Sequence, residues 1–177
     1  MSIPQLPRPA CLLVGMFMKD QTLFQPVINC LTTEFGAIGL VSRWFSFNFT
    51  SYYEKEMGGP LYRRMISFLQ QIDPSQLPDI KHRTNDIEMQ FGNQDRRQVN
   101  IDPGYLVPER FVLATGKNYT HRIYLNNGIY ADLTLIYQKG QFQTLPWTYP
   151  DYAADNVKSF LTNVRKHYLS MKEKDHV

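Results

Sequence analysis

The stretch CLLVGMFM, residues 11–18, decides the fold class of this chain of 177 residues. It is a near-continuous apolar run, which is typical of a strand that is covered on both faces and central in its sheet. It is too short to cross a bilayer, and neither a basic segment nor a small-residue cleavage site flanks it. We therefore expect a buried strand here, rather than a signal peptide or a membrane span.

The segments that follow this strand alternate between helical and extended patterns. Asp20 or Thr22 caps a predicted helix whose apolar residues recur at three- and four-residue spacing until Gly36 ends it. Residues 38–49 are rich in β-branched and aromatic side chains and predict a second strand. Residues 62–72 have no clean period, and we interpret them as a third strand rather than a helix.

The second half of the chain adds three helical predictions. Asp73-Pro74 is a plausible helix cap, and apolar residues share one face of a helix that ends at Gly92. After a strand at 97–101, residues 102–105 have Pro and Gly at the central positions of a type II turn, and 108–115 predict a short helix. The last helix has apolar residues at the i, i+3, i+4, i+7 and i+11 positions from Val157.

The order strand, helix, strand, strand, helix, strand is that of a ferredoxin-like βαββαβ unit. We therefore expect an α+β sandwich, extended by a C-terminal antiparallel β-hairpin and a terminal helix. The length suits one domain, 1–177, with an N-terminal arm at 1–9 and a disordered tail at 171–177.

Composition excludes several classes of function. The net charge is +3, but the 19 Lys and Arg are scattered among 16 acids, so nucleic acid is not implied. Cys11 and Cys30 form no C-x-x-C pair, which argues against a thiolate metal cluster or a disulfide framework and fits a reducing cytoplasm. The one excess is aromatic, at 14% of the chain, and its clusters beside charges are candidate binding surfaces.

The stretch NYTHRIYLNNGIYADLTLIY, from residue 118, predicts a β-hairpin with an unusual number of polar side chains. A three-residue loop at 126–128, closed by Gly128, separates a polar face from an apolar face. The pairs that follow are Leu125 with Ile129, Tyr124 with Tyr130, Ile123 with Ala131, Arg122 with Asp132, and His121 with Leu133. The polar face is expected to form one wall of an aromatic-lined pocket.

Two of these side chains have a simpler explanation than a binding site. Arg122 and Asp132 could be a solvated surface ion pair, worth under about 1 kcal/mol. His121 falls on the apolar face, where a histidine is more often a core residue that is hydrogen-bonded to a neighbour than a proton carrier. Both alternatives stay open at this point.

Charged residues also surround the glycine bend in SYYEKEMGGPLYRR, residues 51–64. Glu54 and Glu56 could bind a metal or act as acid and base, and Arg63 and Arg64 could bind a phosphate or carboxylate. The alternative is that these groups neutralise one another on the surface. The glycine bend favours a ligand loop.

Two further segments carry candidate residues. Asp102 lies at a predicted strand end, and the turn after it would fix Tyr105. LPWTYPDY, residues 145–152, is interpreted as a clamp that docks its rings onto the body, rather than as a stacking platform for bases. Gly116-Lys117 is not part of a P-loop, since Phe111 and Asn118 stand where that motif needs Gly and Ser or Thr.

Six strings of this sequence, YYEKEMG, RRMISF, VNIDPGYL, VLATGKNYTHRIYL, GIYADLTLIY and LPWTYPDY, resemble a bacterial family called domain of unknown function 4416. The resemblance spans nearly the whole chain and implies one domain. No activity is established for that family, although some members carry a GTP-binding label. The signature positions are Tyr53, Glu54, Glu56, Arg63, Asp102, Tyr105, Lys117, His121, Arg122, Tyr124, Trp147, Tyr149 and Asp151.

The leading hypothesis is a small anionic ligand, with a nucleotide as one candidate, bound between the glutamate–arginine loop and the hairpin. Arg63, Arg122 and Lys117 would bind the anion, while the aromatic rings would cover a flat moiety. A second hypothesis is an enzyme that uses Glu54, Glu56 or Asp102 as acid, base or metal ligand and His121 as proton carrier. A third is a protein-interaction module, and a homodimer is compatible with all three.

Overall fold

The computed structural model describes residues 1–49, 53–92 and 96–174, without the side chains of residues 54, 55 and 172–174. Within these residues the chain forms one antiparallel sheet, whose strands follow the order β2-β4-β1-β5-β6-β8-β7, with β3 paired to β4 and β9 paired to β8. The strands are β1 (Ala10–Met18), β2 (Ile38–Val41), β3 (Phe45–Phe47), β4 (Leu61–Ile72), β5 (Val99–Val107), β6 (Arg110–Thr115), β7 (Arg122–Asn126), β8 (Ile129–Gln138) and β9 (Gln141–Thr144).

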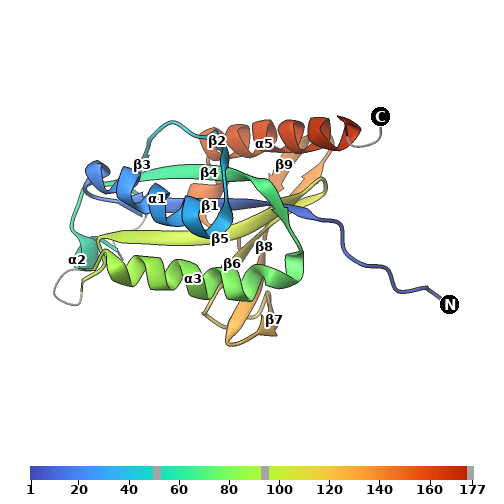
Figure 1. The fold of residues 1–177 in the computed structure, drawn as a ribbon, viewed down its shortest axis with the longest axis horizontal. Helices are drawn as coiled ribbons and strands as arrows, with labels where there is room; N and C mark the ends of the chain where they lie inside the picture. Colours follow the sequence, from blue (N-terminus) through green and yellow to red (C-terminus); the bar gives the residue numbers. More distant parts are fainter. Residues whose placement is uncertain (50–52, 93–95, 175–177) are drawn as a thin grey trace.

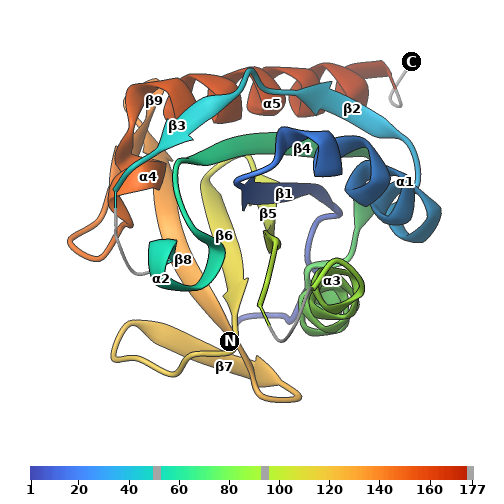
Figure 2. The same cartoon turned by 90° about the vertical axis from the view of Figure 1, so that its left-hand side faces the viewer.

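Helices cover both faces of this sheet (Figures 1 and 2). They are α1 (Phe24–Phe35), α2 (Glu54–Met57), α3 (Leu77–Gln90), α4 (Pro150–Ala153) and α5 (Asp155–Lys174), with short 3-10 turns at Gln21–Leu23 and Pro74–Gln76. The expected mixed fold with α and β layers is therefore confirmed. In the described part of the chain, no helix is long and apolar enough to cross a membrane.

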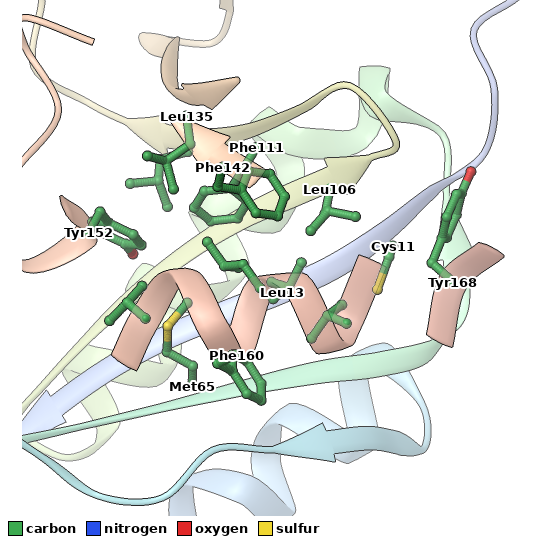
Figure 3. Packing of buried hydrophobic residues seen from close by; sticks show 14 residues of the cluster. Cys11, Leu13, Met65, Leu106, Phe111, Leu135, Phe142, Tyr152, Phe160 and Tyr168 are labelled. Carbon is green, nitrogen blue, oxygen red and sulfur yellow. The ribbon is translucent and has the colours of Figure 1, made fainter. Parts of the chain in front are cut away.

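The first strand connects the two halves of the core. All nine residues of β1 are buried, as the apolar run at 11–18 predicts. Leu12, Val14 and Met16 pack against apolar residues of α1 and α3 on one face. On the other face, Cys11 and Leu13 pack against α5 in the cluster of Figure 3, where Tyr152 and Tyr168 lie at opposite ends. Burial on both faces explains why this strand lacks the alternation of a half-exposed one.

Most of the predicted elements before residue 101 are confirmed. Gly36 ends α1 with φ 86°, a conformation that favours glycine. Asp73 caps the turn before α3 in a capping box with Gln76. Residues 61–72 are the long strand β4. The predicted strand at 38–49 is instead two short strands, β2 and β3, that pair with successive parts of β4.

The tail predicted to be disordered from residue 171 is helical as far as Lys174, and residues 175–177 lie outside the described part of the chain. Two predictions between residues 101 and 115 are also wrong. Residues 102–105 do not turn, because β5 continues through them and pairs with β1 from Val99 to Leu106. Residues 108–115 are not a helix, since β6 returns along β5 directly after a hairpin at Pro108 and Glu109. In both places cross-strand pairing overrides a local preference of the sequence.

The hairpin register is confirmed for three pairs and wrong at the loop. Arg122 pairs with Asp132, Ile123 with Ala131 and Tyr124 with Tyr130. Beyond them a bulge at Leu125 leads to a two-residue turn, in which Asn127 and Gly128 have φ of 50° and 75°. The extra residue in the bulge keeps the two faces of the hairpin separate even though the turn is shorter than predicted.

Candidate functional site

The candidate site is a cavity of about 500 Å³ at the point where β5 and β6 diverge. β5 is paired with β1 from Val99 to Leu106, but it pairs with β6 only from Gly104 to Val107. Pro103 comes next, and it has no N–H with which to extend that pairing. The separated strands provide Asn100 and Asp102 on one wall and residues 113–117 on the other.

Two side chains of α3 occupy the open edge of β5. Lys81 Nζ donates to the carbonyl oxygen of Ile101 at 2.8 Å, and Glu88 Oε1 accepts from the N–H of Ile101 at 2.6 Å. These bonds satisfy the backbone groups that a neighbouring strand would otherwise pair. As a result, the ammonium group of Lys81 and the carboxyl group of Glu88 both line the cavity.

Neither Lys81 nor Glu88 was among the residues predicted from the sequence. Both are buried in α3, together with Leu77, Thr84 and Ile87, at the spacing of the apolar stripe of that helix. Charged side chains almost never occupy such positions unless they are paired. Two charges seven residues apart within an apolar stripe are thus the sequence signal for this wall of the site.

A network of charges connects this wall to the α2 segment. Lys81 Nζ lies 4.0 Å from Glu88 Oε1 and 3.8 Å from Asp102 Oδ1. Asn100 donates to Asp102 at 2.7 Å. Arg97 donates to both carboxylate oxygens of Glu56 at 2.8 Å and to Asn100 at 3.0 Å.

The carboxyl groups of Glu88 and Glu56 differ in pKa, because their surroundings differ. Burial raises the pKa of Glu88, although nearby Lys81 and the Ile101 N–H oppose the increase. The hydrogen bonds from Arg97 lower the pKa of Glu56. Glu88 therefore holds a proton more readily than Glu56 does, and Glu88 is the one that lines the cavity.

Aromatic rings form the opposite corner of the cavity. Phe17 from β1 stacks on Phe47 from β3, with ring centroids 4.4 Å apart. Tyr53 packs edge-on against Phe17 at 4.7 Å, and Phe49 packs edge-on against Phe47 at 6.2 Å. All four line the cavity, and we call them the aromatic corner. Such a surface suits the face of a flat ring.

Behind this corner lies a fully buried arginine. Arg63 is 1% exposed and forms an ion pair with Asp151, while its guanidinium group lies 4.1 Å from the centre of the Tyr152 ring. Asp151 and Tyr152 belong to α4, and both line the cavity, although Arg63 itself does not. Gly15 faces this group, since a Cβ atom there would lie 2.8 Å from Arg63 Nη2 and 2.9 Å from the Tyr152 hydroxyl.

The hairpin supports the cavity from outside. Arg122 Nε donates to Asp132 at 2.9 Å, and the remaining nitrogens of that guanidinium group donate to the carbonyl oxygen of Lys117 and the hydroxyl of Tyr149. Lys117 and Tyr149 line the cavity. With Asp132 1% exposed, the interpretation of this pair as a solvated surface contact is wrong.

His121 also turns toward Asp132. Its Nε2 lies 3.2 Å from Asp132 Oδ2, and its ring stacks on Trp147 with centroids 4.9 Å apart. The predicted place on the apolar face, opposite Leu133, is wrong because β7 begins only at Arg122. The alternation of the strand therefore does not extend to the histidine. Neither His121 nor Trp147 lines the cavity.

The structure thus brings some of the predicted residues together and leaves others apart. Those that line the cavity are Tyr53, Asp102, Lys117, Tyr149 and Asp151. One contact away lie Glu56 and Arg63, which pair with Arg97 and Asp151, and Arg122, which donates to Lys117 and Tyr149. The side chain of Glu54 lies outside the described residues.

Three predicted residues lie elsewhere. Arg64 is stacked between Phe24 and Trp44, at 4.3 and 5.1 Å from their ring centres. Tyr105 packs beside Leu77 on another part of the sheet, and Tyr124 is 57% exposed on β7. Within the described ranges, His, Cys, Asp and Glu side chains form no group of three that could hold a metal ion.

Comparison with known proteins is consistent with the resemblance seen in the sequence. No curated protein and no solved structure matches the chain. One family model matches residues 8–168, which extend from the residues before β1 into α5 and include every wall of the cavity. The chain therefore belongs to the family described as Domain of unknown function (DUF4416).

Proposed function

We propose that the chain binds a small molecule with a flat conjugated ring and an anionic end, in the cavity between β5 and β6. A nucleotide is the first class to test. The observation that carries the proposal is one cavity of about 500 Å³ in which the aromatic corner lies beside charged side chains, among them Lys81, Arg97 and Lys117. Cavities of this size hold ligands of a few hundred daltons, with apolar surface for the body and a few polar groups for orientation.

The aromatic corner supports the ring end of the ligand. Phe17 and Phe47 are nearly parallel, with an angle of 6° between their planes, and Tyr53 and Phe49 stand edge-on beside them. A flat ring placed against this surface gains stacking energy of about 1–3 kcal/mol. An aliphatic ligand of equal size would gain less from the same surface.

Cationic side chains support the anionic end. Lys81, Arg97 and Lys117 line the cavity, and burial favours the neutral form of Glu88. Arg63 and Arg122 were expected to bind the anion, but each is already paired with a buried aspartate. Lys81 donates to the carbonyl oxygen of Ile101, but both of its carboxylate neighbours lie beyond hydrogen-bond distance, so its charge is less closely paired.

A thermal-shift panel tests the proposal. It compares nucleotides with the matching nucleosides, ribose 5-phosphate and inorganic phosphate. At a concentration about 100 times Kd, a bound nucleotide should raise the melting temperature by about 5–10 °C. The separated halves of the ligand should raise it much less, because each half uses only one side of the cavity.

Pairs of variants, one inside the cavity and one outside it, test whether the nucleotide binds in the cavity. Phe47→Leu removes part of the aromatic corner, while Phe24→Leu removes a ring that packs with Trp44 and Arg64 outside the cavity. Lys117→Met is compared with Lys166→Met, since Lys166 is an exposed residue of α5. The cavity variants should weaken nucleotide binding about tenfold or more, and their controls should not. Equal affinities in both members of each pair, or no response to any nucleotide, would refute the proposal.

A second candidate function is acid–base catalysis on the bound ligand. It is favoured by the two carboxyl groups at the cavity, because Glu88 is buried with a raised pKa whereas the Asp102 side chain is 30% exposed and accepts from Asn100. Carboxyl groups in such different environments can serve as acid and base. Mass spectrometry of the ligand after incubation tests this function. Conversion by the wild type and its loss in Glu88→Gln would support catalysis, whereas an unchanged ligand would refute it.

We also propose that the first part of the fold is a ferredoxin-like unit. The strand order β2-β4-β1-β5, with α1 and α3 in the two crossover connections, supports this assignment. In this view β6 to β9 and α5 are an extension, and the cavity lies where the unit and the extension meet. A crystal structure with a different strand order would refute it.

A further inference from the structure

The wall of the cavity formed by α4 carries a buried hydroxyl, that of Tyr152, beside the buried guanidinium group of Arg63. Tyr152 is 2% exposed and Arg63 is 1% exposed. Arg63 is close to Asp151 through Nη1 and interacts with the Tyr152 oxygen, but among the described residues no acceptor faces the Tyr152 O–H. Buried polar groups are almost always hydrogen-bonded, so this hydroxyl indicates a missing acceptor.

The two side chains meet at one point of the sheet. A Cβ atom on Gly15 would be within 3 Å of both Arg63 Nη2 and the Tyr152 hydroxyl, so a side chain at this position would displace the pair. Tyr152 lines the cavity, and Phe47, whose ring centre is 5.8 Å from the Arg63 guanidinium group, belongs to the aromatic corner. A ring held in that corner therefore has the Tyr152 hydroxyl near its edge.

The charges of Arg63 and Asp151 determine which kind of acceptor can bind beside Tyr152. Asp151 already neutralises Arg63, so a second carboxylate or a phosphate here would leave an uncompensated negative charge in a buried place. A neutral oxygen would accept the O–H of Tyr152 without that cost. Burial raises the pKa of Tyr152, so its hydroxyl keeps its proton and remains a donor.

We propose that the Tyr152 hydroxyl, held in place by Arg63, donates to a carbonyl oxygen on the edge of the ligand ring, so that the cavity selects conjugated rings with a carbonyl group over rings with an amino group. The inference rests on the proposed function, because it assigns one position of the same ligand. An amino group at that position would place its own N–H groups against the O–H of Tyr152. Sites built to pair a polar group of the ligand discriminate strongly against analogues that cannot pair with it.

Isothermal titration with two matched pairs of nucleotides tests the inference. Inosine 5′-monophosphate and adenosine 5′-monophosphate carry a carbonyl and an amino group at the same ring position, as do uridine and cytidine 5′-monophosphate. The wild type should bind the carbonyl member of at least one pair about tenfold more tightly, as expected for one discriminating polar contact. Tyr152→Phe should remove most of that preference.

Tyr168→Phe is the matched control. Tyr168 is a buried tyrosine at the other end of the same core cluster, and its hydroxyl donates to Pro9 outside the cavity (Figure 3). This variant should keep the preference of the wild type.

Each other outcome overturns the inference in a distinguishable way. Equal binding of both members, or tighter binding of the amino member, would refute the carbonyl subsite and leave the proposed function intact. A preference that survives in Tyr152→Phe would mean that the Tyr152 hydroxyl does not contact the ligand. No binding of any nucleotide would refute the proposed function and this inference together.

Discussion

The substitution Gly104→Ala tests the strand arrangement that opens the cavity. Gly104 is the last residue of β5 that pairs with β6 before the two strands separate. A Cβ atom there would lie 2.4 Å from the backbone oxygen of Val112 and 3.1 Å from a side-chain carbon of Leu113. Since the closest atom belongs to the backbone of the neighbouring strand, no change of rotamer can relieve the contact, and β6 itself must move.

The magnitude follows from this contact. Ordinary contacts of a Cβ atom begin at 3.4 Å, so β6 would have to shift by roughly 1 Å, and overpacking of this kind costs about 1–3 kcal/mol or more. Alanine recovers about 0.4–1 kcal/mol through the lower entropy of the unfolded chain. The net loss should be about 2 kcal/mol, which corresponds to roughly 4–8 °C in melting temperature for a chain of this length.

Urea denaturation of wild type and variant measures this loss. Gly116→Ala is the control, because a Cβ atom at that position would meet no atom within 4 Å and its backbone is not in the left-handed region. It should change the free energy of unfolding by less than about 0.5 kcal/mol. A Gly104→Ala variant as stable as this control would show that the two strands do not approach closely at the divergence point.

Three further predictions follow from the buried polar groups. Because burial raises the pKa of Glu88 above the ordinary value of 4.5, the folded chain holds that proton longer than the unfolded chain does. The free energy of unfolding of the wild type should therefore decrease as the pH rises from about 4.5 through the folded pKa, at up to about 1.4 kcal/mol per unit, and urea titrations of Glu88→Gln should lack this contribution. Tyr168→Phe should cost about 1 kcal/mol, whereas Tyr152→Phe, which removes an O–H without an acceptor among the described residues, should cost nothing measurable in the ligand-free protein; a loss in both would contradict the difference between the two tyrosines. Asp132→Asn removes the buried negative charge that pairs with the Arg122 guanidinium group and should cost about 3 kcal/mol by thermal or urea unfolding, while a loss below about 1 kcal/mol would mean that the pair is solvated after all.

The sequence predicts the layers of the fold but not the point at which β5 and β6 separate. The apolar run at 11–18 identifies a strand with both faces covered, and helix caps at Asp73 and Gly36 are local signals. Pro103-Gly104 is locally a turn signal, yet the pairing of β5 with β1 keeps the segment extended. The proline then faces the side where no strand pairs, which depends on tertiary structure and cannot be read from neighbouring residues.

In the candidate site, too, the sequence predicts contacts between neighbouring residues but not contacts between distant segments. The pairing of Arg122 with Asp132 follows from the hairpin register, but their burial depends on contacts with Lys117 and Tyr149 from other segments. The ion pair of Arg63 with Asp151 joins residues 88 positions apart, and no periodicity predicts it. Glu88 was missed although its position in the apolar stripe of α3 is visible in the sequence.

A crystal structure of the protein soaked with the nucleotide that gives the largest thermal shift tests the central claim most directly. We predict that β5 and β6 pair only from Gly104 to Val107 and that the ring lies in the space between them, against Phe17 and Phe47, with its charged end toward Lys81. A sheet in which β6 continues along Ile101 and fills that space would contradict the claim, and so would a ligand bound outside it.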